Sequence, residues 1–365
     1  MKKTLVTAII ISSITFFMFE IGLATLTNFS IIKIGVPSYT FSNITSRFWV
    51  DANEDFGVWH EPNSKYTHAM VCFEVDYLAN QHGARDKERT LNSTQNRTVV
   101  LGDSFTEGFG IETGYRFTDI FENQTGREHL NFGTTGSFGT IQQSLMYETM
   151  ASKFTHDSVI IAMLPENDFF DDDLDYGKEY YSDRYRPYYN GEYPDYNIVY
   201  HPQNFVQHQS PSFIQKVKGF FREYTHTIHL LIYLKGLYFH NKNVGAIKNT
   251  YSGYYDFDKE SINRMRFSYE KIIRIAKQNN RDVFIFSIPM LTDIQRFKNE
   301  GKAPLTEIMQ DLSNELGFEY IDLLPHMASY TPNWDEYYLT CNDHWSNKGH
   351  SVAADYLINQ FSLYK

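Results

Sequence analysis

Val99-Val100-Leu101-Gly102-Asp103-Ser104-Phe105-Thr106-Glu107-Gly108 is the stretch that decides the fold. Its three leading apolar residues are typical of a strand covered on both faces, and Gly102 and Gly108 bracket a sharp bend. We therefore expect a buried strand, a tight turn and a helix, with Ser104 at the carboxyl edge of a parallel sheet. Open α/β sheets bind ligands at that edge, where a helix N-terminus offers free N–H donors. Taken alone, the pattern favours a serine that only caps the helix.

Strands and helices alternate from residue 98 onward. The expected strands are 98–103, 129–132, 158–164, 283–288 and 319–323. The expected helices are 115–126, 140–153, 259–280, 304–316 and 347–361. This alternation predicts a three-layer α/β/α sandwich around a five-stranded parallel sheet, a flavodoxin-like arrangement.

An insertion, 171–258, separates the third and fourth strands. A strand-to-helix connection needs only a few residues, so we expect the insertion to have structure of its own. Residues 176–201 are rich in Tyr, Asp and Pro, and 213–239 have helical apolar spacing. Because the insertion leaves the carboxyl end of the third strand, it should overhang the edge that carries Ser104. It would act there as a substrate lid, or as a separate subdomain or partner surface.

The N-terminal segment predicts export. Lysines at 2–3 precede the apolar run 5–19, a pattern that keeps the N-terminus in the cytoplasm and exports the rest. Residues 5–26, which include Glu20, are long enough to anchor the chain in an inner membrane and leave it at the periplasmic or extracytoplasmic face. Residues 22–24 include the small residues that a signal peptidase needs, so a cleaved signal peptide is a second alternative. A buried helix of a cytosolic protein is the third.

The chain divides into three expected parts. Residues 1–27 form a signal anchor or signal peptide, and 28–97 form an extended region with an edge strand at 72–77. Residues 98–365 form the α/β domain, insertion included. The formal net charge of −11 and pI near 5.6 argue against a nucleic-acid partner, because phosphate binding needs a basic face. The 27 Tyr and 29 Phe serve either for stacking on sugar rings or as extra core aromatics.

Cys72 and Cys341 are the two cysteines of the chain. In an exported protein such a pair permits one disulfide, and two separate buried thiols are the alternative. Neither cysteine has a second Cys close to it in the sequence, and His226 and His229 lack a third ligand nearby in the sequence. We therefore expect no metal and no cofactor.

A serine nucleophile needs a base within hydrogen-bond reach and donors for the oxyanion. Residues of all the required types follow other predicted strands. The loop 131–136 carries three residues of interest, Asn131, Gly133 and Gly136, and Asn167 follows the third strand. His344 stands just before the last helix.

These blocks resemble the SGNH (GDSL-like) hydrolase superfamily over residues 70–361, and more loosely its exported branch that acts on acyl groups of polysaccharides. Gly102-Asp103-Ser104-Phe105 is similar to the first block, with Phe where Leu is commonest. The other matching positions are Gly136 for the oxyanion glycine, Asn167 after Pro165 for the oxyanion asparagine, and His344 for the histidine. The resemblance implies that Ser104 is the nucleophile and His344 the base, with Gly136 and Asn167 in the oxyanion hole.

One position departs from the family pattern. Its acid stands three residues before the histidine, or two in some members, and those positions here hold Cys341 and Asn342. Asp343 is the available carboxylate, although it can orient His344 only if the loop turns back on itself. Asn342 can orient the Nδ1–H instead, as an amide carbonyl does in Cys-His-Asn sites.

The sequence thus predicts a serine esterase acting on O-acyl (acetyl) esters of carbohydrates or on small esters. A sugar hydroxyl in place of water would make it an O-acyltransferase. The missing acid motivates an alternative from another class, a non-catalytic glycan-binding or assembly protein. Asp103 and Asp168 resemble a carboxylate pair for glycoside cleavage, but we expect them to be turn residues that bind local backbone.

Overall fold

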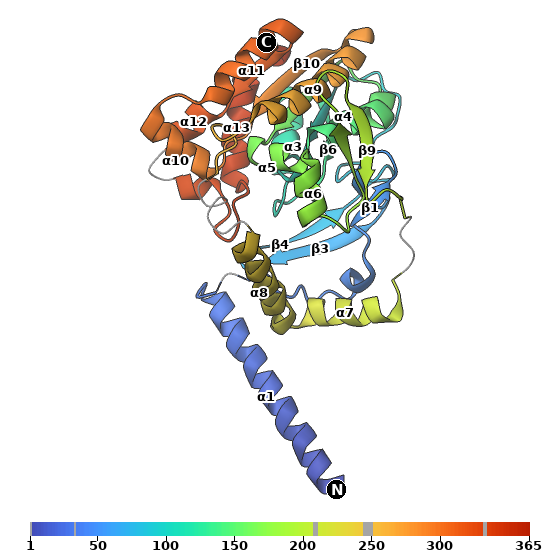
Figure 1. The fold of residues 1–365 in the computed structure, drawn as a ribbon, viewed down its shortest axis with the longest axis vertical. Coiled ribbons are helices and arrows are strands. Elements are labelled where there is room, and N and C mark those ends of the chain that lie inside the picture. The colour runs from blue at the N-terminus through green and yellow to red at the C-terminus, as the bar shows by residue number, and fades with distance from the viewer. Residues whose placement is uncertain (1, 33, 207–210, 244–250, 331–333) are drawn as a thin grey trace.

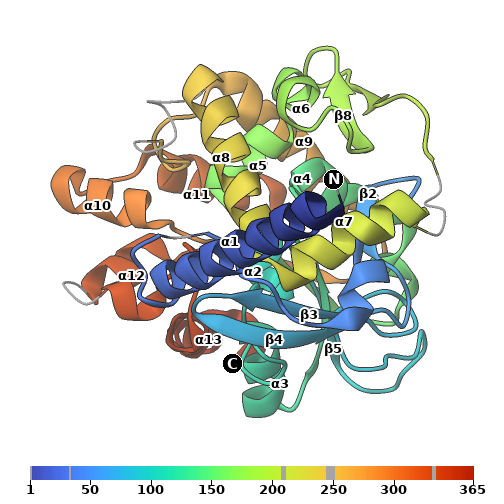
Figure 2. The same ribbon diagram turned by 90° about the horizontal axis from the view of Figure 1, so that it is seen from below.

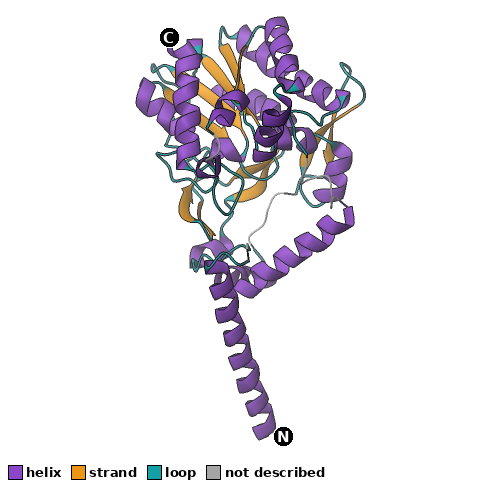
Figure 3. Cartoon of the chain, turned by 90° about the vertical axis from the view of Figure 1, so that its left-hand side faces the viewer, coloured by secondary structure: helices purple, strands orange, loops and turns teal. Residues whose placement is uncertain are grey.

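Five parallel strands form the central sheet of the structure, a computed structural model that describes residues 2–32, 34–206, 211–243, 251–330 and 334–365. The strands follow the order β11-β10-β7-β5-β6 across the sheet. They are β5 (Arg97–Gly102), β6 (Glu128–Gly133), β7 (Ser158–Met163), β10 (Asp282–Ser287) and β11 (Glu319–Asp322). Helices lie on both faces (Figures 1 and 3). The predicted three-layer sandwich is therefore confirmed.

The direction of winding reverses at β5. The chain steps to β6 on one side and then continues to β7, β10 and β11 on the other. Because crossovers are right-handed, this reversal places successive helices on opposite faces. Helices α3 (Phe117–Thr125) and α13 (Asn347–Gln360) pack together, as do α4 (Thr140–Thr149) and α9 (Lys259–Gln278). Such a reversal opens a crevice at the carboxyl ends of the strands, directly where Ser104 follows β5.

The predicted helices recur within a few residues, and shorter ones join them after the strands. Outside the insertion, the other helices of residues 98–365 are α2 (Ser104–Glu107), α5 (Pro165–Asp171), α10 (Leu291–Glu300), α11 (Pro304–Leu316) and α12 (Leu324–Ser329). Three 3-10 helices complete the domain, namely η2 (Ala151–Lys153), η3 (Trp334–Tyr337) and η4 (Ser362–Tyr364). The central strands β5 and β7 are buried along their whole length, as continuous apolar runs predict, and Val99, Val100 and Leu101 are 0% exposed, whereas the edge strand β11 is half-buried.

The region 28–97 is not simply extended, contrary to prediction. It contains η1 (Phe41–Thr45), the hairpin β1 (Trp49–Asn53) with β2 (Gly57–His60), and the hairpin β3 (Lys65–Met70) with β4 (Phe73–Leu78). The expected edge strand at 72–77 is correct as a strand, but β4 pairs with β3 in a two-stranded sheet of their own. Alternation with period two predicts one buried face and does not say which strand is the partner. The buried face of β4 here packs in a separate small core with Phe48.

The insertion contains α6 (Leu174–Tyr180), β8 (Arg186–Asn190), β9 (Asn197–His201), α7 (Phe213–Tyr224) and α8 (His226–Asn243). The helical stretch expected at 213–239 is two helices, because the chain turns at Thr225. The first half of the insertion packs against α4 and β2, and α7 packs on η1. The lid role and the domain boundaries stay predictions.

Helix α1 (Lys2–Asn28) projects from the rest of the molecule (Figure 1). Residues Thr4–Asn28 are long and apolar enough to cross a membrane, by length and composition. The end of α1 packs on α8, where the Glu20 carboxylate accepts the backbone N–H groups of His226 (2.7 Å) and Thr227 (3.0 Å). Glu20 thereby caps the N-terminus of α8, a stabilising position for a negative charge.

We predict that Asp172→Ala lowers the free energy of unfolding by about 2 kcal/mol. The buried Asp172 carboxylate accepts the backbone N–H groups of Thr140 (3.2 Å) and Ile141 (3.1 Å) and so caps α4 from the end of α5. Urea unfolding of the detergent-solubilised chain measures the change. Asp175→Ala, on the exposed side of α6, is the control. Equal unfolding midpoints for the two variants would contradict the assignment of Asp172 as a cap.

Candidate active site

The turn after β5 holds Ser104 at the carboxyl edge of the sheet. Asp103 caps α2 by accepting the Phe105 N–H at 3.0 Å, and Ser104 is the first residue of the helix. The turn requires glycines because a Cβ at Gly102 would collide with the Thr106 side chain, and one at Gly133 with the backbone of α2. These two glycines let α2 sit against the ends of β5 and β6. Ser104 is 6% exposed, so its hydroxyl lies in a largely desolvated site.

The structure brings Ser104, His344 and Asn342 together in a hydrogen-bonded chain. The Ser104 Oγ lies 2.6 Å from His344 Nε2. On the other side of the ring, His344 Nδ1 contacts Asn342 Oδ1. The same amide oxygen accepts the backbone N–H of His344 at 3.2 Å. A backbone N–H can only donate, so this bond fixes the amide oxygen toward the ring, makes Nδ1 the donor and leaves Nε2 free to accept the serine proton.

Asp343 does not take the role that the sequence assigned to it. Its side chain is exposed, and it forms no hydrogen bond or ion pair with any residue of the described ranges. The loop does turn back on itself, but it is Asn342 that folds over the ring. The adjacent carboxylate points elsewhere because neighbouring side chains in a tight turn leave in different directions. The alternative that the sequence left open, an amide carbonyl on Nδ1, is the one present.

Two phenylalanines sandwich the imidazole of His344. The Phe105 ring stacks on it at 4.7 Å and the Phe109 ring at 4.2 Å, with interplanar angles of 26° and 19°. This burial lowers the pKa of His344 to about 3, so the ring is neutral and able to accept a proton across the neutral and mildly acidic range. The charge of the nearby Glu107 carboxylate raises the pKa of His344, but burial outweighs it.

A disulfide anchors the histidine loop. Cys341 is bonded to Cys72, whose Cα lies 5.7 Å away in the turn between β3 and β4. Within the loop, the Leu339 N–H donates to the His344 carbonyl at 2.8 Å. The bond joins residues 269 apart in the chain. The disulfide therefore fixes Cys341, the residue beside Asn342, to the turn between β3 and β4.

The two candidate oxyanion residues, Gly136 and Asn167, lie in segments that neighbour α2. Gly136 has φ +119°, a conformation that favours glycine, and a Cβ there would lie 3.1 Å from a Val58 methyl. The neighbouring Thr135 N–H donates to the Glu107 carboxylate at the end of α2. Asn167, in the first turn of α5, lies beside the Asp103 carboxyl at the start of α2. Gly136 is linked to α2 through its neighbour Thr135.

Glu107 is a buried supporting residue that the sequence reasoning missed. Its carboxylate accepts the Trp49 indole N–H at 3.0 Å and lies 3.4 Å from His60 Nε2. Burial raises the pKa of Glu107, but the hydrogen bonds and charges around it, led by those of His60, outweigh burial and lower it. Arg85 donates to the Glu107 carbonyl at 2.9 Å. These partners lie in the region 28–97, and nothing in the local sequence indicates that they meet Glu107.

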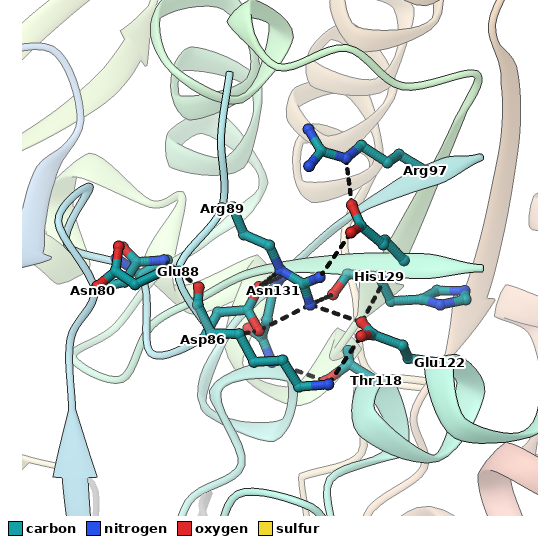
Figure 4. Close-up of polar contacts among 12 residues, drawn as sticks. Asn80, Asp86, Glu88, Arg89, Arg97, Thr118, Glu122, His129 and Asn131 are labelled. Carbon is teal, nitrogen blue, oxygen red and sulfur yellow. Dashed lines mark hydrogen bonds and ion pairs between the residues drawn. The ribbon is translucent and has the colours of Figure 1, made fainter. Parts of the chain in front are cut away.

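Asn131 locks α2 to the neighbouring elements (Figure 4). Its Nδ2 donates to the Thr106 carbonyl at 2.6 Å and to the Thr118 hydroxyl at 3.0 Å. Its backbone N–H donates to Asp86, which is paired with Arg89 at 2.9 Å. Arg89 also contacts carboxylates of α3 and β6. The polar segment before β5 is therefore fixed along the sheet edge and supports the serine turn.

The other polar residues singled out in the sequence lie in structural positions. Asp103 and Asp168 each accept a backbone N–H of their own turn, from Phe105 (3.0 Å) and Leu164 (2.9 Å). Burial raises the pKa of Asp103 to about 7 and that of Asp168 well above its usual value. His229 of α8 contacts the Arg222 carbonyl at 2.9 Å. No group of three or more His, Cys, Asp or Glu side chains that could hold a metal ion occurs in the described ranges.

No protein-family model and no curated protein matches the chain. Solved structures are similar to it. The lipase/acylhydrolase from Enterococcus faecalis is 15% identical with a TM-score of 0.37, covering 73% of this chain and 94% of that one. A member of the lipolytic protein G-D-S-L family from Veillonella parvula DSM 2008 is 11% identical with a TM-score of 0.38, covering 73% and 98%. The acetyl xylan esterase AlAXEase is 11% identical with a TM-score of 0.37, covering 72% and 98%.

We predict that Asn342→Asp moves the acid limb of kcat/KM for a simple ester upward by about 1–3 pH units. The base must be neutral, and the wild-type His344 pKa of about 3 keeps it so down to strongly acidic pH. A carboxylate at 342 stabilises the imidazolium, raises its pKa and causes activity to fall at a higher pH. Asp343→Asn, at an exposed position, should leave the profile unchanged. Identical acid limbs for wild type and Asn342→Asp would contradict the contact on Nδ1.

We predict that the double variant Cys72→Ser with Cys341→Ser loses about 2–4 kcal/mol of stability, the usual contribution of a disulfide. Ester turnover should fall as well, because the loop that carries Asn342 and His344 is released from the β3–β4 turn. Thermal unfolding and steady-state kinetics measure the two effects. Wild type treated with a reductant is the control and should behave like the variant. A variant with unchanged turnover would show that the loop holds its geometry without the bond.

Proposed function

We propose that the protein is a serine-dependent esterase that acts on O-acyl esters through an acyl-enzyme on Ser104. The observation that carries the proposal is the 2.6 Å contact between Ser104 Oγ and His344 Nε2, with Nδ1 held by Asn342. A nucleophile, a base and an orienting group in hydrogen-bond contact are the geometry that activates a serine. The four sequence blocks that resemble the SGNH hydrolases support the same class.

The reaction follows from these positions. Ser104 Oγ attacks the ester carbonyl while its proton passes to His344 Nε2, and the tetrahedral oxyanion forms beside the Ser104 and Gly136 N–H groups and the Asn167 amide. The oxyanion collapses, the C–O bond to the alcohol breaks, and the alcohol leaves with the proton from Nε2. Water then attacks the acyl-enzyme, gives its proton to Nε2 and releases the acid, and the proton returns to Ser104.

We propose an O-acylated carbohydrate as the substrate class. A cavity of about 380 Å³ lies against α5, the helix that carries Asn167. Its lining combines aromatic rings with charged groups, namely Phe170, Tyr176, Tyr251, Asp173, Asp256 and Arg264 among others. Aromatic faces stack on sugar rings and charged side chains bind sugar hydroxyls, a combination that suits a carbohydrate better than a plain acyl chain.

Transfer to a sugar hydroxyl uses the same site, since the acceptor alone distinguishes it from hydrolysis. The missing acid is the reason for the non-catalytic alternative. Because the Asn342 amide oxygen contacts His344 Nδ1 in place of that acid, this reason no longer supports the alternative.

We also propose that the globular part is exported and anchored by α1. The apolar helix of Thr4–Asn28 supports the anchor. The Cys72–Cys341 disulfide supports an oxidising compartment such as the periplasm.

We predict that a fluorophosphonate probe labels the wild-type chain and fails to label Ser104→Ala. Asn342→Ala should be labelled at least roughly tenfold more slowly, because the ring loses its orienting partner. Ser351→Ala on α13 is the control and should react like wild type. In-gel fluorescence of the intact chain measures the rates. Equal labelling of wild type and Ser104→Ala would refute the esterase and the transferase together.

An acyl donor supplied with and without acetyl-accepting oligosaccharides separates hydrolysis from transfer. Mass spectrometry of the sugar gives the readout. An acylated sugar that depends on Ser104 supports transfer, and free acid alone at high acceptor concentration supports hydrolysis.

A further inference from the structure

Helix α7 carries an apolar stripe that faces away from the domain. Its members recur at helical spacing on one side, and they are Phe213 (80% exposed), Ile214 (67%), Val217 (39%), Phe220 (46%) and Phe221 (43%). A surface helix of a globular protein ordinarily turns such a stripe toward the core. Here the stripe is left outside.

The opposite side of α7 is the one that packs on the protein, and it is polar. A Cβ at Gly219 would lie 2.9 Å from the Ile44 carbonyl, so the helix backbone itself rests on η1. Glu223 is 2% exposed and accepts hydrogen bonds from the Ser38 hydroxyl (2.6 Å) and the Asn43 amide (3.1 Å). The polar side is thus fixed by specific contacts. The outward direction of the apolar stripe is therefore built into the fold.

The apolar surface continues beyond α7. On α8, Leu231, Ile232 and Leu234 are 49–54% exposed. A groove of about 680 Å³ runs between α7, α8 and the segment 44–50. Phe29 and Phe41, in the chain that leaves α1, are each 75% exposed. Val217 and Phe221 of α7 line this groove together with Leu231 and Ile232 of α8, so the apolar face of α7 continues onto α8.

Cationic side chains flank this face in a chain whose formal net charge is −11. Lys216 and Lys218 are exposed on α7, and Arg222 and Lys235 line the groove. Basic residues beside an apolar stripe are the composition of helices that lie in the headgroup region of anionic membranes. The local charge runs against the charge of the whole molecule and complements phospholipid phosphates.

With α1 as the membrane anchor proposed above, its position brings a bilayer against this face. Helix α1 is long and apolar enough to cross a membrane, and Glu20 ties its outer part to the start of α8. In the view of Figure 1, α7 is steeply inclined to α1 and lies at the end of α1 nearest the domain, the side that Figure 2 shows from below. A helix steeply inclined to a membrane-spanning helix, at the end where that helix leaves the bilayer, lies along the membrane surface. The hairpin β3–β4, which carries Cys72, lies between this layer and the central sheet (Figure 1).

We propose that the outward face of α7 and α8 docks on the anionic phospholipid surface of the membrane that α1 enters. The occupant is the lipid headgroup and upper acyl region, into which Phe213, Val217 and Phe220 insert while Lys216 and Lys218 bind phosphates. The α/β domain then has a fixed orientation on the bilayer in place of a free tether. The docking involves no step at Ser104, so it stands or falls independently of the esterase.

Depth-dependent fluorescence quenching tests the docking on the full chain in lipid nanodiscs. Both native cysteines are in the disulfide, so a new cysteine gives a single labelling site. A bimane label at Phe220→Cys should be quenched about twofold or more by doxyl-lipids near the headgroups, as for an inserted apolar residue. The control label at Asp311→Cys, exposed on α11 at the far end of the domain, should not be quenched.

Ile214→Cys provides a second labelling site, so that a misfolded Phe220→Cys chain does not decide the result. Absence of quenching at both 214 and 220 in lipid-only discs would overturn the proposal and leave the face to a protein partner. The double variant Lys216→Glu with Lys218→Glu should reduce quenching in discs containing phosphatidylglycerol and not in phosphatidylcholine discs. Equal quenching in the two lipids would overturn the anionic preference. Fluorophosphonate labelling of Ser104 in each variant reports separately on the proposed enzyme.

Discussion

The hydrogen bond between the Asn342 amide oxygen and His344 Nδ1 is the interaction on which the candidate site depends. Without it, the ring could turn its protonated nitrogen toward Ser104 and lose the capacity to accept a proton. The backbone N–H of His344 holds the same oxygen and prevents the amide from flipping. An amide brings no negative charge to the ring. Burial between Phe105 and Phe109 therefore lowers the pKa of His344, and the charge of Glu107 opposes this only in part.

The segment before β5 acts as a scaffold for this arrangement. Cys72 holds the histidine loop, Trp49 and His60 meet the carboxylate of Glu107, and Arg85 binds the carbonyl end of α2. A four-residue helix has little stability of its own, because most helical stability comes from tertiary packing. The serine turn is therefore held by contacts from distant segments on several sides. These contacts explain why two small hairpins outside the main sheet belong to the site.

The molecule is asymmetric about the sheet. One end is an α/β domain with an ordinary polar exterior, and the other end joins α1, the reversed amphipathic helix α7 and α8 (Figure 1). Polar contacts of Glu20 join α1 to α8, and polar contacts of Glu223 join α7 to the chain at Ser38. An unpaired carboxylate at such positions would be costly, and each is satisfied by backbone or side-chain donors. Polar groups thus set the direction in which the apolar surface points.

The sequence by itself determined the alternation of strands and helices, the apolar N-terminal helix and the four blocks at the strand ends, because each is a local pattern of residue types. Only the tertiary structure decided the partners. Period-two alternation in 72–77 could not say that β4 pairs with β3, and spacing could not say whether Asn342 or Asp343 would face the ring. Glu107 gave no signal, since Trp49 and His60 reach it from about fifty residues away through loop closure that no local pattern encodes. Helical periodicity likewise predicted an amphipathic segment at 213–239, yet only packing on η1 determined that the apolar side of α7 faces outward.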